Sequence, residues 1–339
     1  MASIDVMRDP TKSGKAIRAQ LRETIPRDIA LETDFKEGTK YTITEHVTTL
    51  LDELCKNPRT LAVFTSLVKH LHAFARETEL SHDEWRLAIE MLTRAGKEST
   101  DFKNEFILLS DTLGLSVLLD EVAHPHPDGA TESCEEGPFF TVDAPELPSG
   151  TSLVKDGTLG EALYFESTVK NLQGEPIKGA KLEIWQADGD GLYDVQYPDR
   201  QEANNRARIV ATDDGVAIFH GVMPTAYPIP SDGPVGDMLR ATGRHPHRAS
   251  HLHFHITAPG YDTLTTALYP DFSPFLGTDP VFATRKSLIC PMGLSTDPAE
   301  WAKLGLQEGD VRTGRVHIWK YGFVLASNEE VAALKAKKK

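Results

Sequence analysis

Five of the thirteen histidines lie within one eleven-residue stretch, as His245, His247, His251, His253 and His255. Side chains alternate along a β-strand, so the last three would share one face about 6.6 Å apart, close enough for neighbouring imidazoles to bind one metal ion. Histidines on a strand can equally be surface residues or satisfied core residues. His245 and His247 flank a proline beside arginines, and we do not expect them to be ligands.

Two tyrosines occupy turn-rich segments. Tyr193 follows Asp188-Gly-Asp-Gly-Leu192, and Tyr227 lies in Pro224-Thr-Ala-Tyr-Pro-Ile-Pro230. Loops on a rigid scaffold often carry functional residues, although tyrosines in turns commonly serve only for packing. The sequence contains no HExxH motif and no cysteine pair with zinc spacing, so zinc-hydrolase templates fit poorly.

The composition excludes several classes of protein. The 339 residues carry a formal net charge of −14 at pH 7, which argues against a nucleic-acid partner. No apolar run approaches the ~20 residues of a membrane span, and the first thirty residues lack an apolar signal core, so we expect no membrane span. The three cysteines, Cys55, Cys134 and Cys290, resemble no disulfide framework, which favours a reducing, cytoplasmic location.

The first third of the chain has the apolar spacing of amphipathic helices, from Tyr41 to about Asp120. Ser81-His-Asp-Glu84 has the form of a capping box at the start of one helix. A fourth helix is expected from about Asp101 through Leu113, with Gly114 inside it or at its end. We therefore predict an N-terminal helical domain over residues 1–125.

From His124-Pro-His-Pro-Asp-Gly129 onward, proline and glycine cluster and alternating patterns replace helical ones. The expected strands are Leu163–Val169, Lys181–Trp185, Val216–Phe219, Leu252–Ala258, Leu264–Tyr269 and Val316–Leu325. Short strands at these spacings are typical of a sandwich rather than of βαβ units. The predicted fold class is α+β, with the helical domain followed by a mainly antiparallel β-sandwich over residues 126–328 and a basic tail over 329–339.

Four segments together carry a specific resemblance: Glu136–Phe139, Gly179–Asp194, Tyr227–Gly236 and Arg248–Phe254. They resemble the intradiol ring-cleavage dioxygenases, the family that contains catechol and hydroxyquinol 1,2-dioxygenases. The resemblance covers most of the chain. It implies one non-haem Fe(III) per subunit, held by Tyr193, Tyr227, His251 and His253. His255 then lies outside the ligand set, and Tyr197, which does not match the motif, is structural.

The resemblance also implies the reaction, in which an aromatic diol or triol binds the iron and O2 cleaves the ring between the two hydroxyl-bearing carbons. Tyr227 would take up a substrate proton, and Arg248 would stabilise negative charge on the ring. A strand-edge salt bridge is the other interpretation of Arg248. Ala267 stands where relatives carry a glutamine or a histidine, so any hydrogen bond from that position is missing here.

The residues that match the substrate pocket of hydroxyquinol-cleaving relatives are Leu108, Asp111, Gly137, Pro138, Phe139, Ile229, Pro230, Arg248 and Val281. Asp111 favours hydroxyquinol (1,2,4-trihydroxybenzene), because a carboxylate can accept a hydrogen bond from the third hydroxyl. Asp111 could instead cap or ion-pair on a helix surface, in which case catechol is the substrate and cis,cis-muconate the product. Glu135 and Glu136 add acidic groups near the pocket mouth, which would disfavour anionic substrates.

The family resemblance further implies a homodimer joined through the N-terminal helices, sometimes with a lipid between them. The competing hypothesis from another class of protein is a catalytically silent sandwich that binds a ligand and retains the metal motif. The presence of all four implied ligands, Tyr193, Tyr227, His251 and His253, argues against that hypothesis.

Overall fold

The computed structural model describes residues 42–100, 103–155, 157–199 and 202–337. The chain divides into two compact units, Met1–Trp85 and Arg86–Lys339, each of which is described by itself. None of the described helices is long and apolar enough to cross a bilayer.

The first unit is helical in its described part. It contains α3 (Ile43–Leu54), α4 (Pro58–Glu77) and the start of α5 (His82–Glu98), which continues into the second unit. A capping box between Thr42 and Glu45 begins α3, and Asn57 caps α4. The predicted capping box before α5 is confirmed, because Ser81 and Glu84 exchange hydrogen bonds between side chain and backbone.

The predicted fourth helix is present, and a further helix follows it directly. They are α6 (Glu105–Thr112) and α7 (Leu115–Ala123), and the expected start at Asp101 lies outside the described residues. Gly114 separates them with φ +74°, a left-handed conformation that an α-helix cannot continue through. Three further helices follow, α8 (Pro234–Ala241), α9 (Pro298–Lys303) and α10 (Asn328–Lys337), so that the predicted basic tail is helical in its described part.

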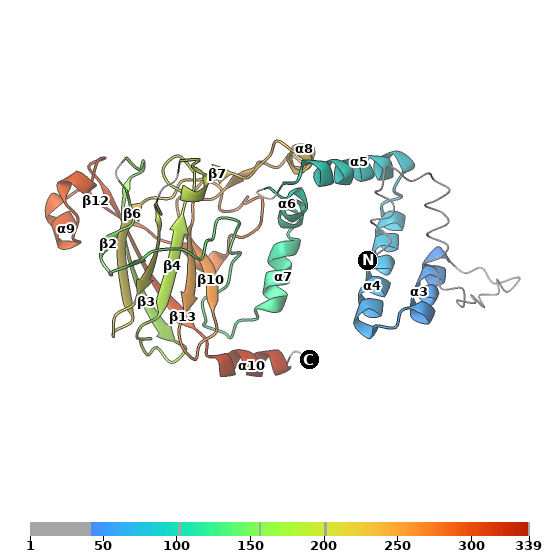
Figure 1. Ribbon diagram of the computed structural model, residues 1–339, viewed down its shortest axis with the longest axis horizontal. Coiled ribbons are helices and arrows are strands. Elements are labelled where there is room, and N and C mark those ends of the chain that lie inside the picture. Colours follow the sequence, from blue (N-terminus) through green and yellow to red (C-terminus); the bar gives the residue numbers. More distant parts are fainter. Residues whose placement is uncertain (1–41, 101–102, 156, 200–201, 338–339) are drawn as a thin grey trace, which may run out of the picture. The chain divides into compact units, whose positions relative to one another are not determined.

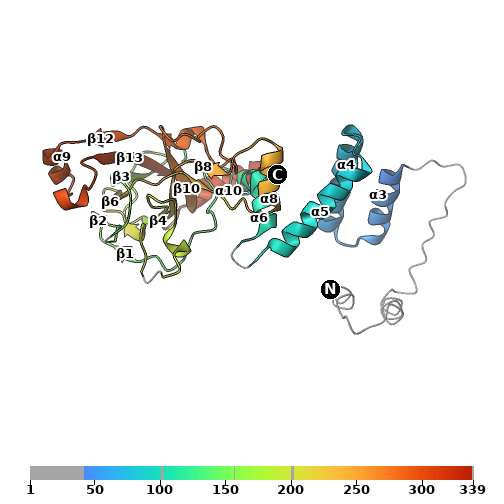
Figure 2. The ribbon, with the colours of Figure 1, turned by 90° about the horizontal axis from the view of Figure 1, so that it is seen from above.

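Two sheets form the body of the second unit (Figures 1 and 2). In spatial order, the six-stranded sheet contains β1 (Glu146–Leu147), β5 (Arg206–Val210), β4 (Lys181–Gln186), β9 (Leu252–Thr257), β10 (Leu264–Pro270) and β11 (Ile289–Cys290). The five-stranded sheet contains β12 (Gly293–Ser295), β13 (Val316–Leu325), β3 (Ala162–Asn171), β6 (Val216–Val222) and β2 (Thr151–Ser152). A separate two-stranded ladder joins β7 (Tyr227–Pro228) to β8 (His247–Arg248).

The two sheets pack face to face through aromatic side chains. Phe165 on β3 lies 5.1 Å from Phe254 on β9, and Phe254 lies 4.8 Å from Phe323 on β13, between ring centroids. These rings are almost fully buried and belong to one core cluster that draws on both sheets. The predicted α+β class with a sandwich is confirmed, and all six predicted strands are present.

The sheets are mixed rather than purely antiparallel. The ten-residue ladder between β3 and β13 is parallel and joins segments about 150 residues apart in the chain. The ladders of β1 with β5, β2 with β6 and β10 with β11 are parallel as well. Alternation along one strand predicts that strand but carries no information on the direction of its neighbour.

Candidate active site

The structure brings the four implied metal ligands together at one end of the six-stranded sheet. Tyr193 lies on the loop after β4, and Tyr227 is the first residue of β7. His251 immediately precedes β9, which contains His253. All four side chains are buried, with 7% exposure at most. Burial of two phenols and two imidazoles in one place needs compensation, because polar groups are costly to bury unpaired.

The distances between the donor atoms suit a metal ion. The Nε2 atom of His251 lies 3.2 Å from the Tyr193 hydroxyl oxygen and 3.3 Å from that of Tyr227, and the two hydroxyl oxygens are 3.5 Å apart. A point equidistant from these three atoms can lie as little as about 2 Å from each, so the three atoms are close enough to bind one ion at normal metal–ligand distances. The His253 ring lies 4.7 Å from the His251 ring, between centroids.

Neighbouring groups fix the orientation of both imidazoles. The Nδ1 atom of His251 lies 2.6 Å from the carbonyl oxygen of Ala249, which leaves Nε2 for a ligand. The His253 ring is stacked parallel to Trp185 at 4.8 Å. Gly137 lies so close to His253 that an added Cβ would be 3.6 Å from its ring. These contacts place the donor atoms before any ion binds.

Electrostatics keep the two histidines neutral. Burial and then the charge of Arg248 lower the pKa of His251 to about 3, and burial lowers the pKa of His253 well below its usual value. Neutral imidazole is the form that coordinates metals. Burial and the neighbouring Tyr227 raise the pKa of Tyr193, an effect that a bound cation would oppose by stabilising the phenolate.

The donor chemistry fits a hard ferric ion. Phenolate oxygens are hard, anionic ligands, and imidazole nitrogens suit iron. Within the described residues, no group of three or more His, Cys, Asp or Glu side chains could hold a metal ion. A metal ion held by His251 and His253 would therefore need donors of another kind, and the oxygens of Tyr193 and Tyr227 lie within reach.

Arg248 borders the site and is only 4% exposed. The β7–β8 ladder pairs it directly with Tyr227, and its Nη1 atom lies 3.5 Å from the Tyr227 hydroxyl oxygen. Its Nε atom donates to Asp279 at 3.4 Å. Its Nη2 atom is buried and has no partner among the described residues. The guanidinium is thus held by Asp279 and retains a free donor beside Tyr227.

Sequence reasoning missed Asp279. Its carboxylate accepts hydrogen bonds from the backbone N–H groups of Val281 and Ala283, in addition to the contact with Arg248. The same residue therefore organises the loop that carries Val281 and holds the cation of the site. No motif in the sequence marked it, because its partner Arg248 is 31 positions away.

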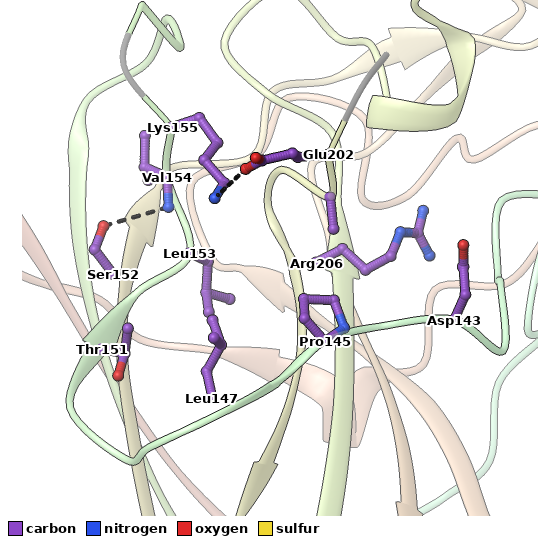
Figure 3. Close-up of a pocket in the computed structure, with 11 residues that line it drawn as sticks. Asp143, Pro145, Leu147, Thr151, Ser152, Leu153, Val154, Lys155, Glu202 and Arg206 are labelled. Carbon is purple, nitrogen blue, oxygen red and sulfur yellow. Dashed lines mark hydrogen bonds and ion pairs between the residues drawn. The ribbon is translucent and has the colours of Figure 1, made fainter.

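A second buried ion pair, which sequence reasoning also missed, stabilises the Tyr193 loop. Arg206 on β5 donates to both carboxylate oxygens of Asp194, and its Nη2 atom donates to the Phe139 carbonyl at 2.7 Å. The Phe139 ring stacks on Tyr193 at 4.4 Å. Arg206 also lines a cavity of about 660 Å³ beside the Lys155–Glu202 ion pair, apart from the predicted site residues (Figure 3).

The other predicted pocket residues differ in their surroundings. Leu108, Ile229 and Val281 belong to the main core or pack against it, whereas Pro138 and Pro230 are exposed. Asp111 on α6 is partly buried and accepts a hydrogen bond from Ser116 at 2.5 Å. Burial raises the pKa of Asp111, and the charge of Arg248 acts on it in the opposite direction.

Four residues singled out in the sequence lie outside the donor cluster. His245 and His247 pack against Phe275, and His255 lies 3.0 Å from the Thr265 hydroxyl. The Tyr197 hydroxyl donates to Asp188 at 2.6 Å, which raises the pKa of Tyr197 to about 12.

Ala267 is fully buried on β10 and is paired directly with His253 on β9. The position that the family resemblance singled out thus adjoins a predicted ligand.

Comparison with known proteins identifies the class. The family model described as "Dioxygenase" matches residues 135–309, just over half of the chain, and "Catechol dioxygenase N terminus" matches residues 57–131. The intradiol ring-cleavage dioxygenase hqdA of Aspergillus niger is 42% identical over 302 residues, 89% of either chain. The protein is therefore a dioxygenase and belongs to the intradiol ring-cleavage dioxygenase family, as the sequence motifs predicted.

Further relatives include the 6-chlorohydroxyquinol 1,2-dioxygenase of Cupriavidus pinatubonensis, 46% identical over 71% of this chain and 87% of that protein. Among solved structures, hydroxyquinol 1,2-dioxygenase from Pseudomonas putida DLL-E4 matches with a TM-score of 0.78 and 36% identity, over 84% of this chain and 98% of that one. Catechol 1,2-dioxygenase from Acinetobacter radioresistens matches with a TM-score of 0.71 and 28% identity, over 87% and 96% of the two chains.

Proposed function

We propose that this protein cleaves hydroxyquinol with O2 between its two adjacent hydroxyl-bearing carbons, giving 3-hydroxy-cis,cis-muconate and its tautomer maleylacetate in aromatic catabolism. The main support for the proposal is the buried cluster of two tyrosines and two histidines beside Arg248, formed by Tyr193, Tyr227, His251 and His253. The relatives named for hydroxyquinol support the choice of substrate. Catechol, cleaved to cis,cis-muconate, is the alternative substrate.

The proposed cofactor is one ferric ion per subunit, held by the two tyrosines and the two histidines. Bound there, the ion would supply a Lewis-acidic centre that chelates an ortho-diphenol and makes it reactive towards O2. The burial of all four donors excludes bulk water from their surroundings.

In the proposed reaction, Tyr227 accepts a proton and Arg248 stabilises negative charge. Tyr227 would hold the ion as a phenolate, and its oxygen would take up a proton that the diphenol releases on binding and so become a neutral hydroxyl. Arg248, 3.5 Å away, favours anionic forms at that position through its charge. Its unpartnered Nη2 atom is a donor for an oxygen of the ring substrate or of the product. Because Asp279 fixes the guanidinium, little reorganisation is needed during the reaction.

Asp111 is the residue that we propose to distinguish the triol from catechol. A hydrogen bond from a ring hydroxyl to a buried carboxylate contributes roughly 1.5–3 kcal/mol, which corresponds to about 10- to 100-fold in kcat/KM. Asp111→Ala should lower the hydroxyquinol-to-catechol ratio of kcat/KM by that factor. Oxygen uptake with hydroxyquinol, catechol and protocatechuate measures it.

Ser116→Ala is the matched control for Asp111→Ala, since it removes the Ser116–Asp111 hydrogen bond but leaves the carboxylate in place. A ratio unchanged in Asp111→Ala would make Asp111 a helix-surface residue and catechol the better assignment.

We further propose a homodimer joined through the helices, with a lipid covering part of the apolar surface between subunits. In the second unit, α6 and α7 expose large apolar side chains, including Ile107, Leu118, Leu119 and Val122. Exposed apolar area of this kind marks interaction surfaces. The proposed location is the cytoplasm, supported by three cysteines that all remain free thiols.

A further inference from the structure

Glu135 lies in a short segment that runs from the sheet to the candidate metal ligands. At one end of it, the N–H of Cys134 donates to the carbonyl of Thr265 on β10 at 2.9 Å. At the other end, Gly137 packs on the His253 ring. With both sides anchored, the backbone at Glu135 is fixed beside the site.

The Glu135 carboxyl group has an unusual environment. Its Oε1 atom is buried and has no hydrogen-bond partner among the described residues. A buried polar atom without a partner costs free energy and needs an explanation. The Nη2 atom of Arg248 is in the same condition, on a side chain more than nine-tenths buried. An acceptor and a donor therefore both lack partners at one site.

Several charged groups act on Glu135. They are Asp111 on α6, Arg248 on β8, Asp279 on the loop before η2 (Lys286–Leu288) and Asp120 on α7. Negative charges outnumber positive ones in this set. A neutral ring with hydroxyl groups can enter such a pocket and pair with its oxygens, whereas a ring bearing its own carboxylate meets like charge.

Building on the proposed function, we propose that Glu135 is a specificity-determining residue, whose carboxyl group faces the ring of the substrate and excludes diphenols that carry a carboxylate. Glu136, the next residue, is half-exposed, and its carboxylate lies 3.9 Å from His255 Nδ1, outside the set of charges described above. The assignment is therefore to Glu135 and not to the acidic pair as a whole.

The protonation of Glu135 supports the assignment. Burial and then the charge of Asp111 raise the pKa of Glu135 to about 7. As the pH rises from 6 to 8, the charged fraction of this group therefore increases. Exclusion of a carboxylated ring should accordingly be stronger at pH 8, where the ring and Glu135 are both anionic.

The experiment measures the inhibition constant of 3,4-dihydroxybenzoate and the kcat/KM for hydroxyquinol, at pH 6 and pH 8, in the iron-loaded full-length protein. Glu135→Gln removes the charge at nearly constant volume, and Glu136→Gln is the matched control. At pH 8 we expect Glu135→Gln to lower the inhibition constant about tenfold or more, and at pH 6 by much less. The control should change it less than twofold.

Iron content and the visible absorption band of each variant show whether its site is intact. A second variant, Glu135→Val, also removes the charge and should bind 3,4-dihydroxybenzoate more tightly than the wild type at pH 8. An unchanged inhibition constant in both Glu135 variants with an intact iron site would overturn the assignment. If the wild type cleaved catechol but not hydroxyquinol, the proposed substrate would be overturned instead. The inhibition constants of 3,4-dihydroxybenzoate would still test the role of Glu135.

Discussion

Single residues in this site act through partners that are themselves buried. Arg248 is useful as a fixed cation only because Asp279 holds its Nε atom, and both side chains are at most 5% exposed. An unpaired buried cation would strongly destabilise the folded protein. A guanidinium that was free to move would not direct its N–H donors at a fixed position. Asp279 is thus a positioning residue for Arg248.

Replacing Asp279 with Asn tests that role. The N–H groups of Val281 and Ala283 donate to different carboxylate oxygens, so the single amide oxygen can keep only one of these hydrogen bonds, and the negative charge facing Arg248 is lost. We expect kcat for the diphenol to fall about 10- to 100-fold with a small change in KM, since the guanidinium loses its fixed orientation. Steady-state kinetics together with the visible spectrum measure this. A kcat within twofold of wild type would assign Asp279 to loop stability alone.

Removing one phenol oxygen tests the proposed metal ligands. In Tyr193→Phe, the ring can still stack on Phe139, so packing is retained while one oxygen donor is lost. Charge transfer from phenolate to Fe(III) should make the wild type coloured. We expect the variant to have a weaker or shifted visible band and turnover lower by about 100-fold or more. A colourless, fully active wild-type protein containing zinc would contradict the ferric assignment.

At the scale of elements, two loops must approach each other closely for the tyrosines to meet. The Tyr193 loop contains Gly191 at φ +81°, where an added Cβ would lie 3.0 Å from the Cβ of Tyr227. Asp188 closes the same loop by accepting from the N–H groups of Asp190 and Leu192. The spacing of the tyrosine pair therefore depends on the lack of a side chain at Gly191.

Gly191→Ala should separate the tyrosines and weaken iron binding, by about tenfold in dissociation constant. Part of any effect would come from the left-handed backbone, which costs an alanine about 1–2 kcal/mol. Gly150→Ala is the matched control, because Gly150 has φ +88° but no atom within 4 Å of an added Cβ. Metal titration followed by the visible band compares the two. Equal iron affinity in both variants would show that the Gly191–Tyr227 contact does not position the ligands.

At the scale of the whole molecule, the sandwich buries its own core, whereas the helices do not. The core cluster draws on both sheets and is almost solvent-free. On α7, by contrast, Leu118, Leu119 and Val122 are between 52% and 70% exposed. Exposed apolar surface of this extent is typical of an interaction surface, which supports the proposed dimer.

Sedimentation tests the proposed dimer. The full-length protein should sediment at twice its 37.4 kDa mass across micromolar concentrations. Val122→Asp should shift it toward monomer, since a charge buried in an apolar interface is costly. Val142→Asp is the control, because Val142 is 83% exposed and lies outside the helices. A wild-type monomer at every concentration would exclude the dimer.

The sequence alone determined the local features of this protein. Capping at Ser81, strand alternation in 252–257 and the histidine spacing all depend on residues a few positions apart, and neighbouring residues fix their own backbone geometry. The family motifs likewise predicted four metal ligands, and the structure brings these four side chains into one cluster. The sequence left Gly114 either inside the fourth helix or at its end, and the structure places it at the end, with a positive φ.

Only the tertiary structure decided which distant groups meet. Three features join residues that no local sequence pattern links. They are the parallel pairing of β3 with β13, the Arg206–Asp194 ion pair and the contact of Asp279 with Arg248. Strand β5, with Arg206 and Arg208 among its five residues, was not predicted, because charged residues suggest solvent until a buried partner is known. Burial likewise makes Glu135 and Glu136 chemically different, although they are neighbours in the sequence. A carboxyl oxygen of Glu135 is buried, whereas the side chain of Glu136 is 47% exposed.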